Sequence, residues 1–109
     1  MAYYPKQNEA GFQKTVIEYA QLRGWKVLEI RKGMKKNGEY RTPFGANGNG
    51  WNDLFMVRGK RIVYVELKVG RNVMTPEQID WQTVMGATGK VEVFNWYPED
   101  WPEIENVLG

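Results

Sequence analysis

Residues 50–68 constrain the fold of this chain more than any other segment. They contain two runs rich in β-branched and aromatic residues, 53–57 and 62–68, a composition typical of strands. Gly59-Lys60 lies between the runs, and a two-residue loop with glycine first is the signature of a type II′ hairpin turn. The sequence therefore predicts an antiparallel hairpin centred on this dipeptide.

In that hairpin Asp53 lies directly opposite Glu66. Side chains at opposite positions have Cβ atoms about 4.5–5.5 Å apart, and like charges there destabilise a sheet. Alternation along the strand also places Lys68 on the same face as Glu66. A divalent cation between the two carboxylates would turn the repulsion into a binding site, because hard cations take oxygen ligands. The alternative is an edge hairpin whose charges are merely solvated.

These residues carry a family resemblance. The run Gly50-Trp51-Asn52-Asp53, a short hairpin and then Glu66-Leu67-Lys68 resembles the PD-(D/E)XK nuclease superfamily, and more closely its small VRR-NUC domain. The likeness also takes in Glu9, Gln13, the helix end Leu22-Arg23-Gly24-Trp25, Thr75-Pro76-Glu77-Gln78, Trp81 and Gly86. It departs at Asn52, where the name-giving motif of the family has a proline that shapes the turn.

The resemblance implies an α/β, restriction-endonuclease-like fold with an αβββαβ core, in which helices flank a central mixed sheet. It also implies that Asp53 and Glu66 bind Mg²⁺ or Mn²⁺, with the backbone carbonyl of Leu67 as a further ligand. Lys68 would orient or deprotonate the attacking water, or stabilise the transition state. Glu9 would hold a second ion or a bound water, and Gln78 would point back to the site.

The implied activity is metal-dependent hydrolysis of phosphodiester bonds by a structure-specific DNA endonuclease, similar to a Holliday-junction resolvase. Stand-alone members of the family resemble resolvases of branched DNA, and a two-fold homodimer would present two sites to a four-way junction. Trp96, Tyr97 and Trp101 are candidates for the dimer face, or else they cover the sheet. The alternatives in function are a non-catalytic nucleic-acid-binding module on this fold and a small adaptor protein with solvated hairpin charges.

Two of the candidate residues also have purely structural interpretations. Glu9 lies in the first turn of a helix predicted over 8–23, where an acid stabilises the helix dipole. Gln78 completes a capping box that begins at Thr75. Its two roles are compatible only if its side chain leaves the cap.

A basic segment precedes the hairpin. Residues 31–50 contain many glycines and little apolar content, and so predict a long loop that contacts a DNA strand. The candidate DNA-binding residues are Arg31, Lys32, Lys35, Lys36 and Arg41. The alternative is that these charges only keep the protein in solution.

The rest of the chain fits one domain spanning 1–109. Strands are predicted over 25–30 and 90–95, and a last helix over 98–108. The predicted core stripes of the helices are Phe12, Val16, Tyr19 and Ala20 in the first, Trp81, Val84 and Met85 in the second, and Trp101, Ile104, Val107 and Leu108 in the last.

The composition limits the chemistry that is possible. The chain has no cysteine and no histidine, which excludes disulfides, thiolate or imidazole metal ligands and a histidine base. Carboxylates, lysines and metal-activated water are the reactive groups that remain. No apolar run approaches the roughly 20 residues that cross a bilayer, so an intracellular, cytoplasmic protein without membrane contact is expected.

Overall fold

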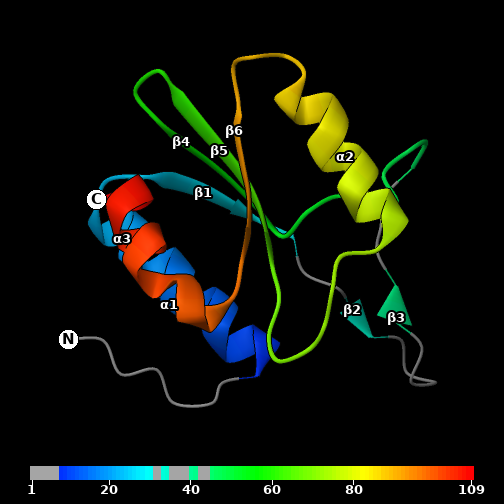
Figure 1. Cartoon of the computed structure of the whole chain (residues 1–109), viewed down its shortest axis with the longest axis horizontal. Coiled ribbons are helices and arrows are strands. Elements are labelled where there is room, and N and C mark those ends of the chain that lie inside the picture. The colour runs from blue at the N-terminus through cyan, green and yellow to red at the C-terminus, as the bar shows by residue number, and fades with distance from the viewer. Residues whose placement is uncertain (1–7, 31–32, 35–39, 42–44) are drawn as a thin grey trace.

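A computed structural model describes residues 8–30, 33–34, 40–41 and 45–109, with the backbone alone at 33–34 and 40–41. Four strands form one mixed sheet: β1 (Lys26–Glu29), β4 (Leu54–Arg58), β5 (Arg61–Leu67) and β6 (Glu92–Trp96), in the order β1-β4-β5-β6. The first three are antiparallel, and β6 pairs with β5 in parallel. Helices α1 (Glu9–Leu22) and α3 (Trp101–Leu108) cover one face and α2 (Pro76–Gly86) covers the other (Figure 1). The predicted α/β class and αβββαβ order are confirmed.

The central hairpin forms in the predicted register. Arg58 pairs with Arg61 and Leu54 pairs with Val65, while Gly59 in the turn has a φ of 61°. A positive φ at the first turn position is what favours glycine there. The ladder ends at Leu54, one residue short of Asp53, so Asp53 lies just outside the regular pairing.

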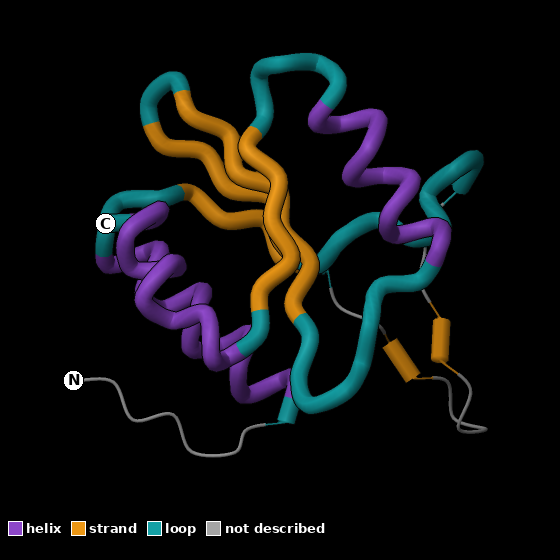
Figure 2. Tube along the Cα trace, viewed as in Figure 1, coloured by secondary structure: helices purple, strands orange, loops and turns teal. Residues whose placement is uncertain are grey.

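Helices α1 and α3 lie together on one side of the sheet (Figure 2), and the apolar core is packed between them and the strands. Asn8 caps α1, since its Oδ1 accepts a 2.7 Å hydrogen bond from the Gly11 N–H. The core contains Phe12, Val16 and Ala20 from α1, Leu54, Met56, Val63, Val65, Leu67 and Trp96 from the sheet, Trp25, and Ile104 and Leu108 from α3. Tyr19, Trp101 and Val107 are half-buried against this core, so the predicted stripes of the first and last helices are confirmed.

Arg58 joins the ends of the two core-side helices. Its Nη1 donates to the carbonyls of Arg23, Leu108 and Gly109, and its guanidinium lies 4.7 Å from the centroid of the Trp25 ring. A cation at the carbonyl ends of two helices stabilises both dipoles. The end of β4 is thereby fixed to the helical layer.

The opposite face is built from aromatic and polar side chains. Trp51 lies 4.9 Å from Tyr64 and 4.8 Å from Trp81, centroid to centroid. The side of α2 nearest the sheet presents Gln78, Trp81, Gln82 and Met85, all buried or half-buried. The prediction that Val84 belongs to the buried stripe is wrong, because its side chain is 51% exposed.

The loop that leads into the hairpin is fixed to α2. Trp81 Nε1 donates to the backbone carbonyls of Asn47 and Asn49, and Gly50 has a φ of 88°. A Cβ at Gly50 would lie 2.5 Å from the carbonyl carbon and from the Cβ of Glu77, so only glycine permits this approach.

The structure also bears on four other predicted features. Within the segment predicted as a loop, β2 (Gly33–Met34) and β3 (Tyr40–Arg41) form a small antiparallel pair. The last helix is preceded by a 3₁₀ turn, η1 (Pro98–Asp100). Trp96 is a candidate for the dimer face from the sequence, but its side chain is fully buried, so that prediction is wrong for Trp96. In the part of the chain described, no helix is long and apolar enough to span a membrane.

Candidate functional site

Asp53, Glu66 and Lys68 are buried at the end of the sheet where β5 finishes. Their exposed fractions are 7%, 1% and 7%, which is unusual for charged side chains in one small domain. Lys68 Nζ lies 3.2 Å from Glu66 Oε2, and Asp53 Oδ2 accepts a 2.8 Å hydrogen bond from the Leu67 N–H. The hairpin therefore brings together the three charged residues that the sequence singled out.

Backbone bonds hold these groups in place from both sides. The Asp53 carbonyl accepts from the Ile30 N–H at 2.9 Å, and the Lys68 N–H donates to the Trp96 carbonyl at 2.9 Å. The charged cluster is thus tied to β1 and β6 as well as to the hairpin. Sites supported by rigid strands hold their geometry better than sites on loops.

The pKa of Tyr64 is affected by its burial and by the nearby carboxylates of Asp53 and Glu66. The side chain is fully buried, and its hydroxyl accepts a 2.8 Å hydrogen bond from the Asn52 N–H. Burial raises the pKa of Tyr64 to about 12, and the negative charges of Glu66 and Asp53 act in the same direction. Both carboxylates are therefore close enough to influence one phenol.

The donor set of this cluster suits a hard divalent cation. Two buried carboxylates and nearby backbone oxygens are the ligands that Mg²⁺ takes, usually with several retained waters. Among the described residues no three acidic side chains lie close enough together to hold a metal ion. Asp53 and Glu66 would thus bind a partly hydrated ion, and the Leu67 carbonyl remains a predicted ligand.

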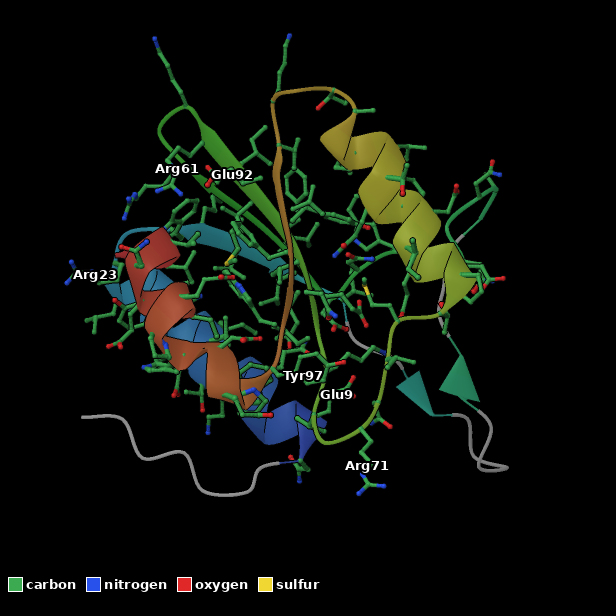
Figure 3. All side chains as sticks on the ribbon, viewed as in Figure 1. Glu9, Arg23, Arg61, Arg71, Glu92 and Tyr97 are labelled. Atoms are coloured by element: carbon green, nitrogen blue, oxygen red, sulfur yellow. The ribbon has the colours of Figure 1, made fainter. Side chains whose placement is uncertain are left out.

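Glu9 begins α1 and is half-buried. In the view of Figure 3 it lies at the end of the sheet where β5 runs into the loop towards α2. It does not join Asp53 and Glu66 in a group of three acids. Its role with a second ion or a bound water stays a prediction. Gln13, one turn later, donates a 3.0 Å hydrogen bond to Glu29 instead.

Gln78 occupies its capping position. Its Oε1 accepts a 2.9 Å hydrogen bond from the Thr75 N–H, and its own N–H donates to Thr75 Oγ1 at 3.2 Å. The structural interpretation of this glutamine is confirmed. A role at the site would require this side chain to leave the cap, and that role stays a prediction.

Asn52 has a structural role that the sequence did not indicate. The side chain is fully buried; Nδ2 donates to the carbonyls of Gly50 and Gln78, and Oδ1 accepts a 2.8 Å bond from Gln82 Nε2. It fastens the residue before Asp53 to α2. Its partner Gln82 is thirty positions away in the sequence, so no periodic pattern could have predicted this contact. The only signal in the sequence was that Asn52 directly precedes Asp53.

The predicted DNA-binding residues fall mostly outside the described part. Four of them lie outside the described residues: Arg31, Lys32, Lys35 and Lys36. Arg41 is described only by its backbone in β3. Arg71, which the sequence did not single out, is exposed on the turn after β5. The Asn72 N–H closes this turn on the Val69 carbonyl, and the Tyr97 hydroxyl donates to the Asn72 carbonyl.

Neither a known family model nor a curated protein sequence matches this chain. The geometry of the site and the resemblance of its motifs are therefore what bears on function.

Proposed function

We propose that this chain is a divalent-metal-dependent DNA endonuclease of the VRR-NUC type within the PD-(D/E)XK superfamily. The observation that supports it most is the burial of Asp53, Glu66 and Lys68 together at one end of the hairpin. Burying charged groups costs stability unless they are compensated, so such a cluster on the polar face of a small sheet favours a functional role.

Each residue has a chemical task in this proposal. Asp53 and Glu66 hold the cation, and the Leu67 N–H fixes the orientation of the Asp53 carboxylate through its 2.8 Å bond. Lys68, placed by its 3.2 Å contact with Glu66, orients the attacking water or stabilises charge that develops on the phosphate. Bound Mg²⁺ or Mn²⁺ supplies Lewis-acid activation of the phosphodiester and of water.

DNA would reach this end of the sheet through basic residues. Arg31, Lys32, Lys35, Lys36 and Arg41 are proposed to contact the backbone, and phosphate contacts of this kind give binding that weakens as salt rises. We propose branched DNA as the substrate and a homodimer as the active form. A solution mass equal to one chain at micromolar concentration would contradict the dimer.

The test uses purified protein with a labelled four-way DNA junction and a linear duplex of matching sequence, in Mn²⁺, Mg²⁺ or EDTA. We expect nicking of the junction that requires the metal. Glu66→Ala and Lys68→Ala should lose this activity while their circular dichroism spectra stay those of the parent. Glu105→Ala, which removes an exposed acid from α3 on the other side of the sheet, is the matched control and should cleave normally.

Full cleavage by Glu66→Ala or Lys68→Ala would overturn the assignment of the site. Salt-dependent DNA binding without nicking in either metal would favour the non-catalytic binding module. Absence of both metal binding and DNA binding would leave the adaptor alternative.

A further inference from the structure

Asn95 lies next to Glu66 on the strand that follows α2. The two residues are paired in the parallel ladder between β5 and β6. Paired positions on neighbouring strands point to the same face of a sheet. Asn95 therefore shares the α2 face with Glu66, and Glu66 stands between Asp53 on the β4 side and Asn95 on the β6 side.

Neighbouring residues of β6 support this orientation. Trp96 and Phe94 belong to the core on the α1 and α3 side. Val93 faces α2 instead, since its Cγ2 lies 3.5 Å from where a Cβ of Gly86 would be. Asn95 is two residues beyond Val93 and so continues the α2-facing row.

The side-chain oxygen of Asn95 is buried without a donor. Within the described residues, Oδ1 is shielded from solvent and accepts no hydrogen bond. A buried polar atom left in this state needs an explanation, because most such atoms in proteins are paired. The amide of Gln82 is already used, since its Nε2 donates to the Phe94 carbonyl at 2.6 Å and to Asn52 Oδ1 at 2.8 Å.

We propose that Asn95 is a further residue of the cation site and supplies a neutral oxygen donor on the β6 side of Glu66. This inference rests on the proposed metal-dependent function. Amide oxygens are hard donors of the kind that Mg²⁺ and Mn²⁺ accept. A neutral ligand also adds no charge to a cluster that already holds two buried carboxylates and one ammonium group. The ligand set then spans three adjacent strands.

The test measures Mn²⁺ binding to the metal-free protein by isothermal titration calorimetry, without DNA and without turnover. We expect Asn95→Ala to weaken the affinity by about tenfold or more, the usual effect of removing a group that supports a metal site. Asn95→Asp keeps an oxygen at the same position and adds a negative charge, so its affinity should equal or exceed that of the parent. Asn106→Asp makes the same chemical change at an exposed position of α3 and should bind Mn²⁺ as the parent does.

The outcomes separate the two levels of the proposal. Unchanged affinity in Asn95→Ala, with affinity lost in Glu66→Ala, overturns this inference and leaves the proposed function intact. Equal weakening in Asn95→Ala and Asn95→Asp shows that the NH₂ group matters, and overturns the assignment of Asn95 as an oxygen donor. A parent protein that binds no Mn²⁺ overturns both proposals. Thermal melts of each metal-free variant identify any loss that comes from unfolding.

Discussion

Replacing Asn52 by alanine is the sharpest test of how the site is supported. The side chain is fully buried and makes three hydrogen bonds, two from Nδ2 to the carbonyls of Gly50 and Gln78 and one to Oδ1 from Gln82. The substitution removes all three side-chain hydrogen bonds and keeps the one that the backbone N–H of residue 52 donates to the Tyr64 hydroxyl. Asp53 follows directly, so its carboxylate depends on this anchor.

The size of the effect follows from those bonds. At about 1 kcal/mol for each hydrogen bond, the free energy of unfolding should fall by about 3 kcal/mol. That is a large share of the roughly 5–15 kcal/mol that stabilises a domain. Urea unfolding followed by tryptophan fluorescence measures it, and a slope of about 1–3 kcal/mol per molar urea moves the midpoint down by about 1–3 M.

Two comparisons make the result decisive. Asn49→Ala removes an exposed amide from the same loop and should change stability by less than about 0.5 kcal/mol. The double variant with Gln82→Ala should deviate from additivity by about 1 kcal/mol, because the two side chains share a 2.8 Å bond. A loss below about 1 kcal/mol in Asn52→Ala, or strict additivity in the cycle, would refute the network as the anchor of Asp53.

Substitutions at three further positions test other parts of the fold. Gly50→Ala should lower the free energy of unfolding by about 1–3 kcal/mol in urea titrations, because of its φ of 88° and its closeness to Glu77. Tyr64 stays protonated in the folded chain up to its pKa of about 12, whereas a tyrosine in the unfolded chain ionises near pH 10. The contribution of Tyr64 to the free energy of unfolding is therefore fully present below pH 10 and is lost between pH 10 and 12. Tyr64→Phe should flatten that decline in urea midpoints measured at pH 8, 10 and 11; an unchanged decline would assign it to other groups. Arg58→Ala should lower the free energy of unfolding by about 2 kcal/mol and lower the melting temperature, because the Arg58 guanidinium binds the carbonyl ends of two helices and stacks on Trp25. Arg58→Lys should restore little of this stability, because lysine lacks the planar guanidinium.

The hairpin and the core helices were predictable because their signals are local. Gly59 marks the turn, alternation sets the two faces of β5, and steps of three and four residues mark Phe12 and Val16 in α1. The register follows directly from the turn, and with it the approach of Asp53 to the end of β5.

The α2 face was harder to predict because it is held by polar contacts. Its helix turns Gln78 and Gln82 towards the sheet and leaves Val84 in solvent, which inverts the usual apolar pattern. The burial of Trp96 follows from the parallel pairing of β6 with β5, and the sequence of β6 alone does not say which face meets the core. Asn52 and Asn95 depend on partners far away along the chain, so no spacing rule identifies them.

The alternation of β5 separates stability from chemistry within one strand. Val63, Val65 and Leu67 face the core of α1 and α3, whereas Tyr64 and Glu66 face α2. Because the apolar core lies on the first face, the second face can carry buried charge whose cost the fold tolerates. Substitutions on the two faces should therefore have different effects. Those at Val63 and Val65 should unfold the protein, whereas Glu66→Ala should leave it folded but unable to bind metal. If the charged face also provided most of the stability, Glu66→Ala would unfold the protein as the valine substitutions do. Measuring the free energy of unfolding and the Mn²⁺ affinity of the same variants decides between these two possibilities.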